Sequence, residues 1–250
     1  MIAEARREQI RELLMATGEV TIGQLQARFG VSPMTARRDL VVLEAQGSAR
    51  RTHGGAVLPS SHAPEHSFAQ RVEVAAAAKL RLADAALELL RPGETVLLDS
   101  SSTAYFLARR IAETGLAVRV LTNSAPVIQA LVGSLEQVEL YLLGGRHRPL
   151  SGSFVGPSTV RMIREHFVDW LFFSVTGVTA GGVLTESDDL EAAVKRAMLE
   201  QTYQSVLLVD AFKLGTHGRQ AIVPLRDVSL VLAEGDDPRL HADGVNVRLV

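Results

Sequence analysis

Apolar residues in the first sixty positions recur at the spacing of short helices, with polar caps between them. The clearest helix starts at Ser32, which suits an N-cap, and continues with Pro33, which suits the first helical position because proline has no N–H to satisfy. Gly47 is expected to cap its far end. Three apolar residues fall on one face of this helix, which we expect to be buried. They are Ala36, Leu40 and Leu43.

Two further helical segments precede this one. Thr21 and Gln24 have the spacing of a capping box, which predicts a second helix that continues up to Gly30. Apolar residues at helical spacing within 3–16 predict a first helix that covers the same small core. Three short helices with a glycine turn between the last two predict a helix-turn-helix domain.

The polar side of the third helix carries groups that a DNA-reading helix presents to the major groove. Its two adjacent arginines can bind guanine edges or phosphates. A basic ribbon at 48–53, followed by a bend at Gly54-Gly55, is interpreted as a wing against the sugar-phosphate backbone. An arginine pair alone is also typical of a solvated helix face, but the whole combination favours DNA binding. The residues expected to contact DNA are Ser32, Thr35, Arg37, Arg38, Arg50, Arg51 and His53.

The periodic pattern stops in a proline-containing polar stretch at 59–67, which predicts a linker. We therefore expect a winged helix-turn-helix domain at 1–58 and a second domain at 68–250. The second domain opens with a helical pattern that runs from Phe68 to Leu90 and stops at Pro92. We expect one long helix there.

Beyond this helix, short apolar runs alternate with helical segments. Most runs are continuously apolar, as expected for strands that helices cover on both faces. This alternation predicts a mostly parallel α/β domain. The predicted strands are Thr95–Leu98, Val118–Leu121, Val138–Leu143, Leu171–Val175, Ser205–Val209 and Leu230–Ala233.

Polar residues and glycines follow five of these strands, at the sheet edge where open parallel sheets bind ligands. A hydroxyl run opens a helix near Thr103, whose backbone N–H groups could bind a phosphate. Asp99 could accept hydrogen bonds from sugar hydroxyls, while Lys213 and Arg146 could neutralise the charge of an anion. Singly, each feature is also typical of a helix cap, a structural ion pair or a turn, but five converging strand ends favour a pocket. The expected effector-binding residues are Asp99, Ser100, Ser101, Ser102, Thr103, Thr122, Asn123, Gly144, Gly145, Arg146, Gly177, Asp210 and Lys213.

Composition narrows the function further. The 250 residues carry a net charge of −2, yet residues 1–58 hold eight arginines against six acidic residues, so the positive charge is local. The absence of cysteine excludes disulfides and thiolate metal sites, and the seven histidines lack ligand-like spacing. No secretory signal or apolar run of membrane-spanning length is present. We expect a cytoplasmic protein with no metal, no cofactor and no membrane partner.

Residues 6–57 resemble the winged N-terminal domain of the DeoR family of bacterial transcription regulators. The resemblance lies in Val31-Ser32-x-x-Thr35-x-Arg37-Arg38-Asp39-Leu40, Leu43-Glu44 and Arg51-x-His53-Gly54-Gly55-Ala56. Ala36 is a departure, because the family usually has a larger aliphatic residue there.

The rest of the chain resembles the sensor domain of the same family. That domain is similar to sugar-phosphate isomerases of the ribose-5-phosphate isomerase type and is understood to bind phosphorylated sugars. This chain departs from the family at two serines: the family has glycine at the position of Ser101 and often has glycine at the position of Ser174. The matching residues are Phe68-x-x-Arg71, Lys79, Asp99-x-x-x-Thr103, Thr122-Asn123, Gly144-Gly145, Asp169, Gly177, Lys195-Arg196-x-Met198 and Asp210-x-x-Lys213.

The resemblance implies a repressor of sugar-metabolism genes that binds double-stranded operator DNA and responds to a phosphorylated sugar or related metabolite. A homodimer or homotetramer is expected, because one small winged module buries too little DNA for strong specificity. We expect no enzymatic activity. One alternative is a sugar-phosphate isomerase-like enzyme with an accessory DNA-binding domain, in which Asp99, Glu186 or Asp210 is the base and Lys213 the electrophile. Another is a dinucleotide-sensing repressor, disfavoured because no G-x-G-x-x-G follows the first strand of the second domain.

Overall fold

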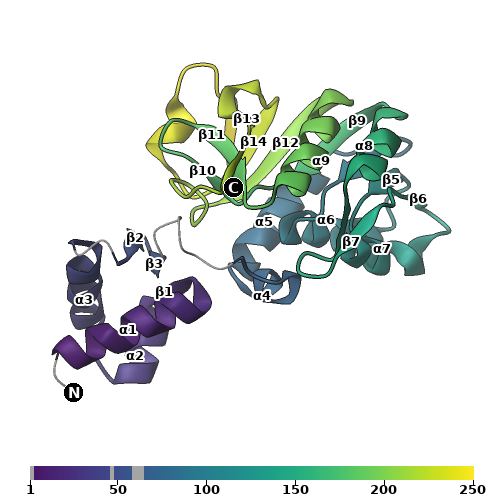
Figure 1. The fold of residues 1–250 in the computed structure, drawn as a ribbon. Helices are drawn as coiled ribbons and strands as arrows, with labels where there is room; N and C mark the ends of the chain where they lie inside the picture. Colours follow the sequence, from purple (N-terminus) through teal and green to yellow (C-terminus); the bar gives the residue numbers. More distant parts are fainter. Residues whose placement is uncertain (1–2, 46–47, 58–64) are drawn as a thin grey trace. The chain divides into compact units, whose positions relative to one another are not determined.

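The chain divides at His66 and Ser67 into two compact units, each described here by itself. The computed structural model describes residues 3–45, 48–57 and 65–250 (Figure 1). Most of the predicted linker, residues 59–64, lies outside the described residues, and so does the predicted cap Gly47.

The N-terminal unit contains the three predicted helices. The Thr21–Gln24 capping box opens the second helix, and Gly30, in the left-handed conformation with φ 63°, closes it. The Thr35 amide donates to Ser32 Oγ at 3.2 Å, so Ser32 caps the third helix as predicted. The helices are α1 (Ala3–Thr17), α2 (Ile22–Phe29) and α3 (Pro33–Ala45).

The predicted wing is an antiparallel hairpin of β2 (Arg50–Thr52) and β3 (Gly55–Val57), with His53 at its turn. A third strand, β1 (Glu19–Thr21), pairs with the other edge of β3 and was not predicted. Gly55 makes this pairing possible, because a Cβ there would lie 1.9 Å from the carbonyl oxygen of Val20. The glycine therefore serves the close approach of β1 as well as the turn.

The C-terminal unit is built on a sheet of seven strands that all pair in parallel, in the order β15-β14-β12-β9-β4-β5-β6. The parallel α/β prediction is thus confirmed. The strands are β4 (Thr95–Leu98), β5 (Arg119–Thr122), β6 (Glu139–Leu142), β9 (Val168–Phe173), β12 (Thr202–Asp210), β14 (Leu230–Glu234) and β15 (Val247–Leu249).

Helices cover both faces of this sheet, which explains why the strands are continuously apolar (Figure 1). Alternate residues of one strand point into opposite cores. Leu97 packs with α8 (Pro157–Arg164) and α9 (Asp189–Glu200), while Val96 and Leu98 pack on the other side. The helices of that second face are α5 (Ala76–Leu87), α6 (Ser102–Thr114) and α7 (Ala125–Leu131).

The expectation of one long helix from Phe68 to Leu90 is wrong. The chain forms α4 (Phe68–Glu73) and α5, separated by Val74 in an extended conformation and by Ala75 in the left-handed region at φ 52°. The buried Lys79 ammonium donates to the carbonyl oxygens of Arg71 and Val74, so a tertiary contact holds the break together. Local alanine propensity for helix is overridden there.

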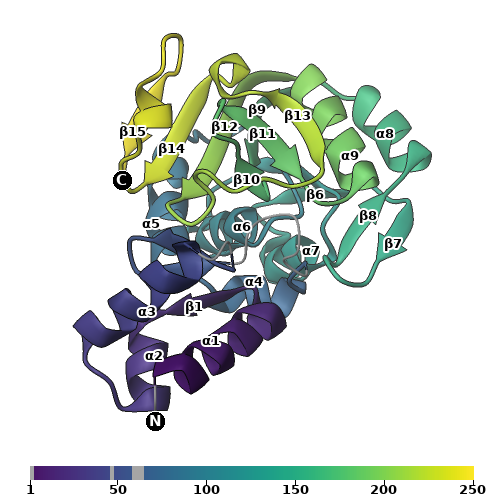
Figure 2. The same ribbon diagram turned by 60° about the vertical axis from the view of Figure 1, so that its left-hand side comes forward.

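Smaller elements complete the carboxyl side of the sheet. An antiparallel three-stranded sheet contains β10 (Gly177–Val178), β11 (Val183–Glu186) and β13 (Gln220–Pro224). A hairpin of β7 (Arg146–Arg148) and β8 (Ser153–Val155) follows β6 (Figure 2). Three short 3₁₀ helices are η1 (Val132–Ser134), η2 (Leu225–Asp227) and η3 (Pro238–His241).

Candidate functional site

The predicted DNA-reading helix is anchored from its buried side. Asp39 of α3 is 3% exposed and accepts hydrogen bonds from Arg6 Nε at 2.6 Å and from Arg7 Nε at 3.2 Å, both on α1. Arg37 and Arg38, just before it, are exposed, and neither has a hydrogen-bond or ion-pair partner within the part of the chain that the structure describes. Asp39 and Leu40 therefore anchor the helix on its buried side. Arg37 and Arg38 keep guanidinium groups without partners among the described residues.

The wing holds its basic residues in different ways. Arg51 donates to Glu44 of α3 from its backbone amide at 2.9 Å and from Nε at 2.7 Å, and these hydrogen bonds lower the pKa of Glu44. Arg50 is partly buried, whereas His53 is exposed at the turn. The ion pair fixes the predicted wing against α3, so that both elements form one surface.

In the C-terminal unit, Asp99 and Ser174 mark the point where the strand order reverses. Chain order runs from β4 outward through β5 and β6, then returns to β9 on the other side of β4. Ligands of open α/β sheets bind at such a point, outside the carboxyl ends of the strands. Asp99 directly follows β4 and accepts hydrogen bonds from the amides of Ser101 at 3.0 Å and Ser174, after β9, at 3.1 Å.

A buried cation, Lys195 of α9, binds the Asp99 carboxylate. Its ammonium also lies 3.5 Å from Glu186 Oε2 on β11. Burial alone would lower the pKa of Lys195, but attraction to Asp99, Glu186 and Glu191 raises it above its usual value. Lys195 is therefore a fixed positive charge beneath the carboxyl edge.

Glu191, also on α9 and 5% exposed, is held by three serines. Ser151 Oγ and Ser153 Oγ of the β7–β8 hairpin donate to Oε1 at 2.8 and 2.6 Å, and Ser100 Oγ donates to Oε2 at 3.2 Å. These bonds tie the hairpin, the segment after β4 and α9 into one wall of the site.

Lys213 lies beyond β12 and donates to Ser174 Oγ at 2.6 Å. Its ammonium is 4.0 Å from Asp210 Oδ2, a weak pairing for a partly buried cation. Burial lowers the pKa of Lys213; the charge of Asp210 opposes this shift, and the positive charge of Arg71 adds to it. The Arg71 guanidinium and the Lys213 ammonium thus act on one another at this edge, where Asp210, Asp99 and Glu186 supply the opposing negative charge.

Several buried polar atoms here have no hydrogen-bond partner among the described residues. They include Nε and Nη2 of Arg71, on α4, together with the hydroxyl of Thr103 and the amide oxygen of Asn123. Thr103 and Asn123 are fully buried and follow the neighbouring strands β4 and β5. Buried polar groups in proteins are nearly always paired, so unpaired ones clustered at a sheet edge point to a ligand.

Other predicted residues take local structural roles. Ser101 Oγ caps α6 by accepting from the Ala104 amide, and Thr122 Oγ1 accepts from the Ser124 amide. Arg146 is exposed on β7 and makes no hydrogen bond or ion pair with any described residue. The remaining members, Ser100, Ser102 and Asp210, are buried at the edge.

Packing accounts for two of the three glycines in the predicted site. A Cβ at Gly145 would lie 2.1 Å from Thr159 Oγ1, and one at Gly177 would lie 2.3 Å from Thr216 Oγ1. Gly144 is different: a Cβ there would meet nothing within 4 Å, and its carbonyl accepts from Thr159 Oγ1. Packing therefore explains the glycines at 145 and 177 but not the one at 144.

The residue-based prediction missed Arg71, Lys195 and Glu191 as members of this site. Arg71 and Lys195 stood in motifs of the resemblance, but their distance in sequence from the strand ends hid their position. Glu191 gave no signal beyond a place near the start of a helix.

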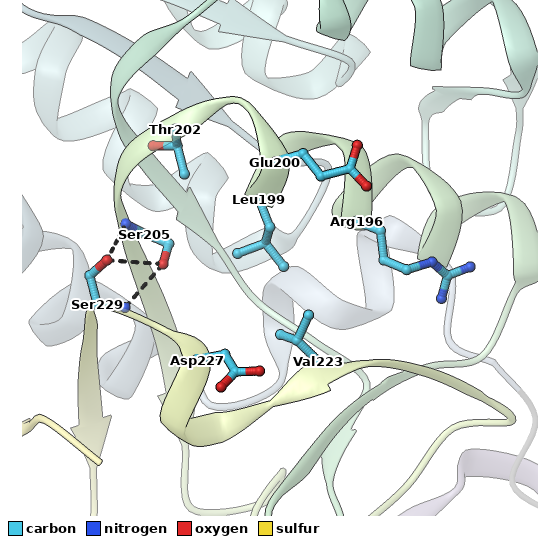
Figure 3. A pocket seen from close by; sticks show the side chains of 8 residues that line it. All are labelled: Arg196, Leu199, Glu200, Thr202, Ser205, Val223, Asp227 and Ser229. Atoms are coloured by element: carbon cyan, nitrogen blue, oxygen red, sulfur yellow. Dashed lines mark hydrogen bonds between the residues drawn. The ribbon is translucent and has the colours of Figure 1, made fainter. Parts of the chain in front are cut away.

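A separate hollow of about 370 Å³ lies near the amino end of β12, away from this edge (Figure 3). Its polar groups already have protein partners: Ser205 and Ser229 bind one another, and Glu200 pairs with Arg164 at 3.1 Å. It is lined by Arg196, Leu199, Glu200, Thr202, Ser205, Val223, Asp227 and Ser229. Nothing in this lining calls for a ligand.

The described residues, 3–45, 48–57 and 65–250, contain neither a cluster of metal ligands nor a membrane-spanning helix. No group of three or more histidine, aspartate or glutamate side chains there could hold a metal ion. No helix in those ranges is both long and apolar enough to cross a membrane.

Two family models match the chain, one for each unit. The DeoR-like helix-turn-helix domain matches residues 6–62, and the DeoR C terminal sensor domain matches residues 74–234. Together they span most of the sequence.

Similar proteins with a named function are transcription regulators. The chain is 34% identical to the lactose phosphotransferase system repressor of Lactococcus lactis subsp. lactis, over 85% of this chain and 84% of that protein. It is 31% identical to the L-fucose operon activator of Escherichia coli (strain K12), over 92% of this chain and 94% of that protein.

Solved structures are more distant. Ribose 5-phosphate isomerase A from Methanocaldococcus jannaschii is 21% identical with a TM-score of 0.40, over 56% of this chain and 54% of the other. A Pyrococcus horikoshii OT3 translation initiation factor eIF-2B is 13% identical with a TM-score of 0.44, over 92% and 88% of the two chains.

Proposed function

The chain belongs to the DeoR family of transcription regulators, and we propose that it represses sugar-metabolism genes and leaves its operator when a phosphorylated sugar occupies the carboxyl edge of the sheet. Both halves of this proposal rest on side chains already described. Such a regulator acts in the cytoplasm, where its DNA is, and binds paired half-sites as a homodimer or homotetramer.

The DNA-binding face consists of α3 and the wing. Arg37 and Arg38 project from α3 without protein partners among the described residues, and they would read base edges. Arg50, Arg51 and His53 of the wing would lie along the phosphates, as would the Ser32 and Thr35 hydroxyls at the N-terminus of α3. The ion pair between Arg51 and Glu44 keeps the wing in register with the helix.

The effector's phosphate would sit between Arg71, Lys213 and the N-terminus of α6. The observation that carries this proposal is the buried Arg71 guanidinium, whose Nε and Nη2 have no partner in the described part of the chain. A guanidinium binds phosphate through two parallel N–H groups, and an ammonium adds a point charge. The amides after Ser101 and the Thr103 hydroxyl complete an anion site at a helix N-terminus.

The sugar would extend from the phosphate toward Asn123 and the carboxylates. The side-chain amide oxygen of Asn123, which has no partner among the described residues, can accept a hydrogen bond from a sugar hydroxyl. The lactose and fucose relatives act, by their names, on carbohydrate genes, which supports a sugar as the organic part of the ligand. Asp99, Ser100, Ser102, Thr122, Asp210 and the glycines 144, 145 and 177 would shape the surrounding wall.

Arg71 offers a route from the site to the DNA-binding unit. It belongs to α4, the first helix after the predicted linker, and Phe68 of the same helix packs edge-on against Tyr105 of α6 at 5.4 Å. A phosphate bound by Arg71 would therefore tighten α4 onto the sheet edge. Ligand binding can shift DNA affinity only if it favours one of two states, and the docking of α4 provides such a difference.

We propose no isomerase turnover, since the similar proteins are regulators. Asp99 supports this: Lys195 and two backbone amides already occupy its carboxylate oxygens, so it is poorly placed to take a proton from substrate.

Replacing Lys213 with methionine should weaken binding of the effector by about ten- to a hundredfold, the value of a hydrogen bond to a charged group. Thermal unfolding in the presence of hexose 1-phosphates, hexose 6-phosphates and inorganic phosphate measures this. Wild-type protein should be stabilised by at least one sugar phosphate, and the variant much less. Arg226→Met removes one exposed charge from η2, which precedes the amino end of β14 and so lies away from this edge, and it is the matched control, because we expect it to leave binding unchanged.

The same measurement carries a pH signature. Because burial and Arg71 lower the pKa of Lys213, this side chain should lose its positive charge at a lower pH than an ordinary lysine does as the pH rises. Affinity should rise as the phosphate becomes dianionic near pH ~6 and fall again as Lys213 loses its proton in alkaline solution. Lys213→Met should lack the alkaline fall. Equal stabilisation of wild type and Lys213→Met by every sugar phosphate would place the effector elsewhere.

A further inference from the structure

The solvent-facing side of α3 is not uniformly polar. Met34, Arg37, Arg38 and Val41 are separated by three, four and seven positions and form one stripe along the helix. Met34 is 57% exposed and Val41 is 45% exposed. Among the other large apolar residues of the helix, Leu40 and Leu43 are at most 1% exposed and Val42 is half-buried, so the two ends of the stripe are the exposed exceptions.

The stripe is complementary to the major groove in charge and in polarity. Its two central arginines have no partner among the described residues and would meet the phosphates or the guanine acceptors O6 and N7. The one apolar group on any base edge in that groove is the methyl of thymine. An apolar side chain next to a base-reading arginine therefore has a defined chemical counterpart.

We propose that Met34 is a specificity-determining residue that reads the methyl group of a thymine next to the bases contacted by Arg37 and Arg38. The inference rests on the proposed DNA-facing role of α3. Met34 is in the first turn of the helix, the part that approaches the bases, whereas Val41 lies about 10 Å further along the axis. A flexible, polarisable thioether also adapts its shape to a methyl better than a branched side chain does.

The position of Met34 fits this role better than a role in folding. Ser32 and Pro33 already define the start of α3, through the Ser32 cap on the Thr35 amide. Ala36 and Leu40 supply the buried contacts of the next turns. Since Met34 contributes to neither, its replacement should leave the stability of the unit unchanged.

The test starts with a library of random 30-base-pair duplexes, from which full-length wild-type protein and Met34→Ala each select their preferred sites. Wild-type sites should share a thymine at one fixed position beside the bases that Arg37 and Arg38 read. Met34→Ala should select the same sites without preference at that position. Val41→Ala removes another exposed apolar side chain from the stripe and should keep that preference.

The selected site is then made with uracil in place of that single thymine, which deletes only the methyl group. Wild-type protein should bind this duplex about fourfold more weakly, as expected for one methyl-sized apolar contact, while Met34→Ala should bind both duplexes equally. Uracil at another thymine of the same site is the control. If the wild type binds thymine and uracil duplexes equally, Met34 does not read the methyl, although α3 can still be the reading helix. A Met34→Ala protein that unfolds at the wild-type temperature yet selects no site would also overturn the inference, because one methyl contact cannot account for such a loss.

Discussion

Replacing Lys195 with methionine is expected to lower the free energy of unfolding of the C-terminal unit by about 3–5 kcal/mol, the usual cost of breaking a buried ion pair from one side. The loss is large because Lys195 serves several carboxylates at once. It binds Asp99, lies 3.5 Å from Glu186 and attracts Glu191, and its own side chain is 5% exposed. Without it, negative charges remain buried together.

The sole tryptophan, Trp170 on β9, makes this measurable for the C-terminal unit alone. Its fluorescence should show that Lys195→Met unfolds with a midpoint at a lower urea concentration than wild type. Arg164→Met is the matched control: it breaks an ion pair with Glu200 in which both side chains are more than half exposed, and should cost at most about 1 kcal/mol. Comparable losses in the two variants would show that Lys195 is not a structural charge.

The pH dependence of this effect follows from the raised pKa of Lys195. A cation whose folded pKa lies above its unfolded value contributes its stability fully below the unfolded value, near pH ~10.4, and loses it only above that. Wild-type protein should therefore keep this contribution throughout the neutral range. The difference in urea midpoint between wild type and Lys195→Met should persist throughout that range.

The double variant Arg37→Ala, Arg38→Ala should lose about 2–6 kcal/mol of specific operator binding, from about 1–3 kcal/mol for each arginine that reads a base. Both side chains are exposed and unpaired among the described residues, so the change removes DNA contacts without removing protein contacts. Binding to operator and to scrambled duplexes at the same salt concentration measures the effect.

Arg28 on α2 offers the matched control for charge. It is exposed, and Arg28→Ala should weaken operator and scrambled DNA alike, if at all, because a phosphate contact carries no sequence information. The double variant should instead bring operator affinity close to that for scrambled DNA. Undiminished operator preference in the double variant would remove α3 from the role of reading helix.

The sequence predicted α3 and its surroundings well because the signals are local. Ser32 caps the helix through the next turn, Gly30 ends α2 in a conformation that other residues avoid, and Leu40 and Leu43 repeat at helical spacing. The central strands were predictable for a similar reason, since burial on both faces makes them continuously apolar. Strands β1 and β15 were not predicted, because each has only three residues, too few to show a pattern.

The parts that escaped prediction depend on side-chain contacts that no periodic pattern reveals. The break between α4 and α5 borders an alanine-rich run, and the contact of the Lys79 ammonium with the carbonyl oxygens of Arg71 and Val74 accounts for it. Strand ends pointed to Asp99 and Lys213, but the pairing of Asp99 with Lys195 joins residues 96 positions apart. The same holds for Arg71, whose place near Lys213 follows from the fold of α4.

The central claim is that sugar-phosphate binding at the carboxyl edge changes DNA affinity, and Arg71 tests it most directly. Operator affinity of the selected duplex is measured with increasing amounts of the sugar phosphate that stabilises wild-type protein, for wild type, Arg71→Met and Arg226→Met. We expect operator binding to weaken about 5–150-fold in wild type and Arg226→Met, the range of typical coupling energies. Arg71→Met should bind operator with wild-type affinity and show no response to the sugar phosphate. An equal response in all three proteins would contradict the account.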